Sequence, residues 1–316
     1  MKNLLLSLLF VLTAACSFAQ NHRDEFGIQS DNDSYLGQGS DRYYTDGLYF
    51  YFRHALDVKG NGDLQNKVLG FDLGQKIFNS QSGYVPSVSY VDRPFAGYLY
   101  AGASMNYLYK NESNLKLGAR IGIVGPASGA EQAQTWVHKN FGFYAPTGWQ
   151  YQIKNDAELN LSGEYNRLLA RDTAIDLSFA SYANLGTGIT GAGVGVLLRL
   201  GVFNQLFNSA STQSSVIAGN SVAPLSKHEF FLYYKPMANV VGYDATIQGG
   251  LFSKKDPGSM EITADPQRFV FSNRFGVTYA NKRWVIDAAA IFHSKETSYQ
   301  QLSEAWGSVT VYYKFN

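Results

Sequence analysis

The sequence predicts an all-β protein, a transmembrane antiparallel β-barrel of about twelve strands with short helices in its extracellular loops. Three observations support this prediction. Aromatic residues make up 15% of the 316 residues, whereas charged residues make up only 16%. Several segments alternate apolar and polar side chains with a period of two, as strands between lipid and a wet lumen do. Beyond the first twenty residues, no run of 18 apolar residues occurs, which excludes a helical membrane protein.

The N-terminal segment has the pattern of a secretory signal peptide. Lys2 supplies a positive charge, residues 4–15 are almost continuously apolar, and Ser17-Phe18-Ala19 offers small residues to a signal peptidase. We expect residues 1–19 to be removed, which leaves residues 20–316 as a single barrel domain. Lipidation of Cys16 is the alternative, although Thr13 stands where a large aliphatic residue is usual.

Charge and cysteine content exclude several functions. Without residues 1–19 the chain carries 25 basic and 25 acidic side chains and no cysteine. A neutral chain has no basic surface for nucleic acid, and without cysteine it has no disulfide or thiolate chemistry. A secreted β-sandwich has similar composition, but nearly 300 residues would be large for one. We expect a monomer among the lipids of the outer membrane of a Gram-negative bacterium.

The clearest strands lie at the C-terminus and in the middle of the chain. Residues 308–315 alternate apolar and polar side chains and place Phe315 next to last, near the terminal aromatic position usual for outer-membrane barrels. In residues 153–162, Ala157, Leu159 and Leu161 alternate with charged and amide side chains that suit a wet lumen. The same template gives strands near 24–33, 45–56, 66–80, 94–109, 114–126, 150–169, 174–187, 191–203, 228–242, 266–281, 283–295 and 305–316.

The connections between these strands differ in length. Residues 111–113 and 280–282 are short polar turns, which we expect on the periplasmic side. Residues 127–149, 204–226 and 243–265 are long and polar, and we expect them to form extracellular loops or lids.

A cluster of oxygen-bearing side chains surrounds the end of the first strand. Asp31-Asn32-Asp33-Ser34 is followed, after a glycine-rich stretch, by residues 41–47 with two more aspartates. Carboxylate and amide oxygens are the ligands that Ca²⁺ prefers. The alternative is a solvated turn with local hydrogen bonds from the Asx side chains.

A second candidate site is the segment from Gly125 to His138. It indicates a turn followed by a short helix that ends near His138, with Gln134 and His138 four residues apart on one helical face. Histidine is a suitable general base near neutral pH. An exposed or purely structural histidine is the alternative.

Together these segments resemble the outer-membrane lipid A 3′-O-deacylase family. The resemblance covers residues 24–155, and six motifs carry it in order. They are Asn32-Asp33, the Asp-Arg-Tyr-Tyr-Thr-Asp-Gly-Leu of 41–48, the Gln-Lys-Ile-Phe of 75–78, the Asp-Arg-Pro-Phe-Ala-Gly of 92–97, the Gly-Pro-x-x-Gly…Gln-x-x-x-His of 125–138, and the Trp-Gln-Tyr-Gln-Ile of 149–153.

The resemblance implies a twelve-stranded barrel with a calcium-dependent esterase site for lipid A of lipopolysaccharide. It implies that Asn32, Asp33, Thr45 and His138 form the active site, and that Gln134 orients a group there. In this mechanism His138 takes a proton from water, and a Ca²⁺ held by Asp33 and Asn32 stabilises the oxyanion.

One feature of that family does not recur in this sequence. Family members carry a lysine near the end of the third strand or in the loop after it, but residues 79–91 contain none. The nearest lysine is Lys76, which cannot be aligned with the family position.

Three other functions remain open. An outer-membrane phospholipase needs an Asn/His/Ser set, and no His-x-Ser pair on one strand supports it. A serine route through Ser34 or Ser128 has no recognisable nucleophile elbow. A non-enzymatic porin or structural barrel would use the acidic and basic side chains only to fill a narrow lumen.

Overall fold

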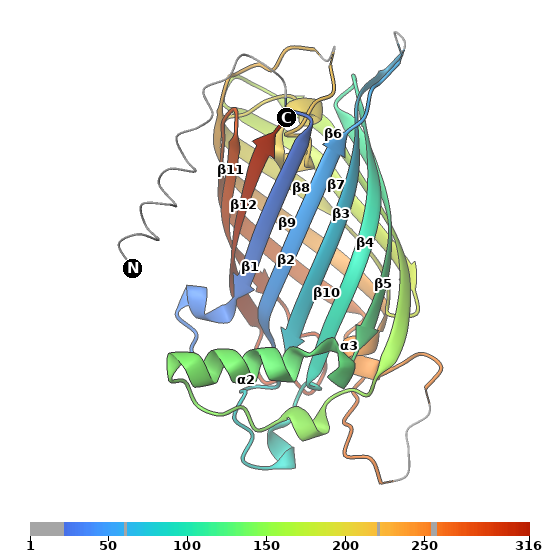
Figure 1. Cartoon of the computed structure of the whole chain (residues 1–316), viewed down its shortest axis with the longest axis vertical. Coiled ribbons are helices and arrows are strands. Elements are labelled where there is room, and N and C mark those ends of the chain that lie inside the picture. The colour runs from blue at the N-terminus through green and yellow to red at the C-terminus, as the bar shows by residue number, and fades with distance from the viewer. Residues whose placement is uncertain (1–21, 60–61, 220–221, 254–257) are drawn as a thin grey trace.

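The computed structural model describes residues 22–59, 62–219, 222–253 and 258–316. The expected signal peptide therefore lies outside the described residues. Twelve antiparallel strands form a closed barrel in which each strand pairs with its neighbours in the chain and β1 pairs with β12 (Figure 1). This confirms both the fold class and the strand count predicted from the sequence.

The strand boundaries follow the alternating pattern closely. The strands are β1 Asp24–Asn32, β2 Tyr44–Ala55, β3 Leu64–Phe78, β4 Ala96–Tyr109, β5 Ser113–Val124, β6 Asp156–Arg171, β7 Ile175–Gly186, β8 Ile189–Val202, β9 Glu229–Asp244, β10 Phe269–Ala280, β11 Trp284–His293 and β12 Glu304–Phe315. The largest discrepancy is at β6, which was expected from residue 150. It begins later because Trp149–Tyr151 forms a turn of 3-10 helix, η4, in which Trp149 is buried.

The two faces of the barrel wall differ in polarity. On β6, Leu159 and Leu161 are more than half exposed on the outside, whereas Glu158 and Asn160 are buried on the inside. The same alternation exposes Phe26 and Ile28 on β1. An apolar outer belt around a polar interior suits a wall immersed in lipid. None of the helices in the described residues is long and apolar enough to cross a membrane.

The lumen is filled by side chains rather than open. Ion pairs cross it, with Lys116 Nζ 3.4 Å from Glu164 Oε1 and Arg274 3.0 Å from Asp287 Oδ1. A cavity of about 220 Å³ remains between such side chains, with Gln29 and Tyr51 in its lining. The charged side chains predicted to face the lumen therefore occupy it.

The two ends of the barrel carry different structures. We call them the α2 end and the terminal end (Figure 1). The α2 end carries helix α2 (Ala130–Phe141), the short helix α3 (Ala245–Gln248), and the turns of 3-10 helix η1 (Asp33–Leu36), η2 (Val88–Tyr90), η3 (Pro126–Ser128) and η4. The terminal end holds the C-terminus and the start of β1, which are adjacent because the barrel has an even number of strands.

The structure corrects the prediction for residues 204–226. This segment was expected beside 127–149 and 243–265 among the extracellular loops, but it lies at the opposite, terminal end. A connection that follows an even-numbered strand, here β8, returns to the end where β1 began, as the turns after β4 and β10 also do. The predicted strand count already implied this position, whereas length and polarity alone did not.

At the terminal end this segment forms a plug in the barrel. Phe207 and Val216 pack against Ala55, Val68 and Leu108 of β2, β3 and β4. The buried Arg199 guanidinium of β8 binds Asp176 and donates to Ser209 Oγ at 2.8 Å. The plug contains the remaining turns of 3-10 helix, η5 (Leu206–Asn208) and η6 (Ala210–Thr212).

Candidate active site at the α2 end

Helix α2 presents its buried face to the ends of β3 and β4. Ala130, Gln134 and His138 are its buried residues and follow one another at intervals of four, so they share one side of the helix. Gly142 ends the helix with a left-handed φ of 77° and donates its N–H to His138 O. The predicted helix and its shared face are therefore confirmed.

His138 is held through both ring nitrogens. Nδ1 lies 2.6 Å from the backbone oxygen of Tyr144, which can only accept, so Nδ1 carries a hydrogen. Nε2 lies 2.8 Å from Asp41 Oδ2. The ring also makes edge contacts with the rings of Phe143 and Tyr144. The histidine is thus fixed in orientation, and Nε2 is the nitrogen left to exchange a proton.

Asp41 is the centre of this arrangement. Its Oδ2 accepts hydrogen bonds from the Tyr144 hydroxyl and, at 3.3 Å, from Gln134 Nε2. Gln134 Oε1 in turn accepts from Trp149 Nε1 at 2.8 Å, and both of these side chains are buried. Gln134 therefore orients the carboxylate that faces His138.

The backbone around Asp41 is strained. Asp41 has a φ of 47° and Tyr43 a φ of 61°, values that side chains other than glycine rarely adopt. Such residues persist only where the surrounding structure enforces them, and they concentrate at functional sites.

Asn32 and Asp33 lie where β1 passes into η1. Asn32 Oδ1 caps η1 by accepting from Ser34 N at 2.7 Å, and its Nδ2 donates to Asp46 Oδ1. Asp33 is completely buried; its Oδ2 accepts from Arg42 N at 3.0 Å, whereas its Oδ1 has no hydrogen-bond partner. A buried carboxylate oxygen without a partner is costly, so this atom requires an explanation.

The environment of Asp33 disfavours its charge. Burial raises the pKa of Asp33 to about 7, against the lowering effect of the hydrogen bond from Arg42 N–H. The negative carboxylates of Asp41 and Asp46 raise that pKa further. The three aspartates thus lie close enough to repel one another.

Thr45 occupies an irregular position in β2. The register of β2 against β3 shifts between Tyr44 and Asp46, so Thr45 is the additional residue of a β-bulge. It is fully buried, and its Oγ1 donates to Tyr43 O at 3.3 Å. The bulge places Thr45 between the strained Tyr43 and Asp46, which binds Asn32.

The structure therefore brings the predicted residues into one region. His138 and Gln134 meet Asp41, Asn32 meets Asp46, and Asp33 meets the backbone of Arg42. Asp41, Asp46 and Tyr144 were not assigned roles from the sequence. The two aspartates belong to the motif at 41–48, so the signal for them was present, whereas Tyr144 lies in a loop without a motif.

Lys76 and the two candidate serines do not join this group. Lys76 lies on β3, and the charged side chains that it faces include Asp31, Asp244 and Glu296. Ser34 Oγ donates to Asn32 Oδ1, and Ser128 Oγ donates to Gly125 O at 2.6 Å. Neither serine hydroxyl contacts His138, which is consistent with the absence of a nucleophile elbow.

The donor set suits a calcium ion. Ca²⁺ takes six to eight oxygen ligands, often carboxylates, and Asp33 Oδ1 is a buried carboxylate oxygen that lacks a partner. A cation there would relieve the repulsion of Asp33, Asp41 and Asp46. Asn32 fits less well than was expected, because its oxygen already accepts from Ser34.

A lipid-facing barrel with a polar cluster at one mouth defines the class of this protein as an outer-membrane β-barrel. The chain belongs to the family described as outer membrane protein LpxR, whose model matches residues 4–315. This confirms the family resemblance drawn from the motifs.

Solved structures agree on the fold. LpxR from Salmonella typhimurium shares 21% identity with this chain at a TM-score of 0.73, covering 92% of this chain and 100% of that one. The β-domain of the Bordetella autotransporter BrkA shares 10% identity at a TM-score of 0.46, covering 94% and 99%. The KdgM porin shares 7% at 0.40, covering 92% and 99%. No curated protein matches the chain.

Proposed function

We propose that this protein is a calcium-dependent lipid A 3′-O-deacylase that hydrolyses the 3′-linked acyl ester in the outer leaflet. The observation that carries the proposal is the contact of His138 Nε2 with Asp41 Oδ2, beside the unpartnered Asp33 Oδ1. A fixed histidine next to a carboxylate is the arrangement that general-base hydrolysis requires. Family membership and the motifs at residues 32–33, 41–48 and 125–138 support the substrate class.

In this mechanism His138 is the general base. The hydrogen bond from Nδ1 to Tyr144 O fixes the tautomer in which Nε2 can accept a proton. Asp41 yields its place at Nε2 to the attacking water and remains beside the ring as a counter-ion. The water loses its proton to Nε2 while its oxygen attacks the ester carbonyl, and the imidazolium then protonates the leaving alkoxide.

The remaining residues position these groups. Gln134 and Tyr144 hold Asp41 through hydrogen bonds, and Asn32 holds Asp46. Thr45 keeps the bulge that places Asp46 next to Asn32. A Ca²⁺ bound by Asp33, with Asp41 and Asp46 nearby, would supply Lewis-acid stabilisation of the negative charge on the ester oxygen.

The closed barrel favours hydrolysis over transport. Ion pairs fill the lumen and the plug closes the terminal end, so a continuous aqueous path through the described residues is interrupted. The α2 end would face the outer leaflet, because barrels of this kind keep both termini and their short turns on the periplasmic side.

The test is a deacylation assay with purified protein in detergent. Wild-type protein should remove the 3′-linked acyl group from lipid A in Ca²⁺ and not in chelator, as mass spectrometry of the product reports. His138→Ala and Asp33→Ala should lose at least a hundredfold in rate. Wild-type rates in both variants would overturn the assignment.

A further inference from the structure

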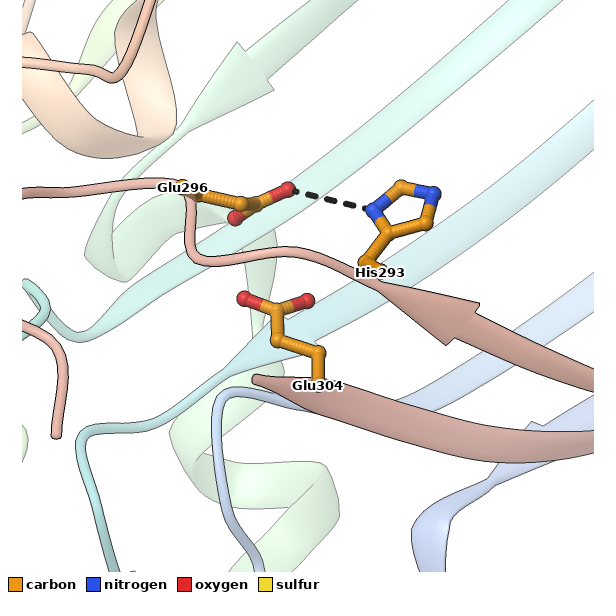
Figure 2. Close-up of side chains that lie close together, drawn as sticks. All are labelled: His293, Glu296 and Glu304. Atoms are coloured by element: carbon orange, nitrogen blue, oxygen red, sulfur yellow. Dashed lines mark ion pairs between the residues drawn. The ribbon is translucent and has the colours of Figure 1, made fainter. Parts of the chain in front are cut away.

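A second group of polar side chains lies at the α2 end, on the hairpin of β11 and β12. His293 is the last residue of β11, Glu304 is the first of β12, and Glu296 belongs to the loop between them (Figure 2). One donor atom from each lies within 4.8 Å of the other two, and His293 Nδ1 lies 3.8 Å from Glu296 Oε1. A nitrogen and two carboxylates thus converge from three points of one hairpin.

The outer oxygens of the two glutamates are already bound. Glu296 Oε2 accepts from the buried Arg93 guanidinium at 3.0 Å. Glu304 Oε1 accepts from Gln300 Nε2 at 2.8 Å and lies 3.9 Å from Arg93 Nε. Each carboxylate is therefore oriented through one oxygen while its other oxygen remains available.

The available atoms lack partners. Glu304 is 2% exposed, and its Oε2 has no hydrogen-bond partner. His293 Nδ1 also makes no hydrogen bond, and its ring is held against Trp306 with the ring centres 4.9 Å apart. Buried polar atoms are normally satisfied, so two such atoms side by side point to a missing ligand.

The charge of this region also favours a cation. The carboxylates of Asp244, Glu296 and Glu304 face Arg93, and Lys76 lies among Asp244, Glu296 and Asp31. Negative charges therefore outnumber positive ones. An anion or a further basic side chain has no corresponding advantage here.

We propose that His293, Glu296 and Glu304 bind a divalent transition-metal ion of the zinc class, at a site separate from His138. Zn²⁺ takes imidazole nitrogen and carboxylate oxygen at about 2.0–2.2 Å, so the three donors need to approach one another by only about 1 Å. Arg93 and Gln300 would act as the outer partners that orient the ligands.

The ion would fasten the mouth of the barrel. Residues of the 294–303 loop bind the segment before β4, with Thr297 Oγ1 donating to Asp92 O at 3.0 Å and Gln301 N to Asp92 Oδ2 at 2.9 Å. Tyr43, next to the strained part of the His138 site, also donates to Asp92. Metal at His293 would therefore stabilise a loop that supports that site.

The test uses the full barrel in detergent after removal of metal by chelator. Calorimetric titration with Zn²⁺ should show one strong site per chain, and Co²⁺ should give a visible absorption band that reports nitrogen ligation. His293→Ala and Glu304→Gln should each weaken Zn²⁺ binding at least tenfold, and His293→Ala should alter the Co²⁺ band.

Two control variants separate this site from other histidines. His228→Ala removes an exposed imidazole at the terminal end, and His138→Ala removes the one at the candidate active site. Both should bind Zn²⁺ like wild type. Unchanged affinity in His293→Ala, or loss of the strong site in His138→Ala, would overturn the proposal. Should Glu304→Gln not fold, Glu296→Gln replaces it, because Glu296 lies in the loop and is partly exposed.

Discussion

His138 Nε2 lies 2.8 Å from Asp41 Oδ2, which joins a helix between β5 and β6 to a strained turn between β1 and β2. The two residues are 97 positions apart, and the contact exists only because α2 crosses the ends of β3 and β4. It determines which nitrogen of His138 can act as a base, and the first prediction concerns it directly.

Asp41→Asn should lower the rate of lipid A deacylation by about 10²–10³-fold, because an amide cannot stabilise the imidazolium that forms on His138. The amide keeps the volume of the side chain, so the barrel should fold normally. Mass spectrometry of the product under single-turnover conditions measures the rate. Asp63→Asn, at an exposed position of the terminal end, is the control and should retain wild-type activity. A fully active Asp41→Asn protein would remove Asp41 from the mechanism.

Calcium affinity should depend on pH through Asp33. Burial raises the pKa of this carboxyl to about 7, so below pH 7 a proton competes with the ion. The affinity should rise about tenfold for each pH unit up to pH 7 and level off above it, with one proton released per ion. Calorimetry between pH 5.5 and 8.5, in buffers of different ionisation enthalpy, measures both quantities.

The matched variants isolate Asp33 in that experiment. Asp33→Asn should bind Ca²⁺ weakly at every pH and lose this dependence. Asp265→Asn, an exposed residue at the same end of the barrel, should keep it. A slope that survives in Asp33→Asn would assign the proton to another group.

Trp149→Phe should loosen α2. The substitution removes the N–H that Gln134 Oε1 accepts at 2.8 Å and leaves that oxygen buried without a partner, which costs about 1–3 kcal/mol. Hydrogen exchange of the α2 amides should become faster by the corresponding factor. Trp136→Phe changes an exposed residue of the same helix and should leave the exchange unchanged. Equal exchange in both variants would show that Trp149 does not hold the helix.

Arg199→Ala should release the plug at the terminal end. The buried Asp176 would lose its paired charge, and breaking such a pair costs about 3–5 kcal/mol. Proteases should then cut within residues 204–226, as mass spectrometry of the fragments reports. Lys59→Ala, an exposed cation at the same end, is the control. Resistance equal to wild type would mean that apolar packing of Phe207 and Val216 suffices.

The barrel was predictable because its wall repeats one local rule. Alternation along each strand gave twelve strands, and the structure moved most boundaries by only a few residues. The β6 boundary and the position of residues 204–226 were wrong for different reasons. Trp149 is drawn into the packing beneath α2, which ends the strand pattern late, and the plug is polar in composition although it fills the barrel.

The sequence by itself determined the lipid-facing wall, the family, and the identity of Asn32, Asp33, Thr45, Gln134 and His138 as candidates, because these depend on alternation and on ordered motifs. Tertiary structure alone decided that Asp41 faces His138, that Asp33 Oδ1 lacks a partner, and that His293 meets Glu304. These contacts join segments far apart in the chain, and their distances depend on strand register, on the bulge at Thr45 and on how α2 crosses the barrel. Those features follow from packing of the whole chain, which no local pattern specifies.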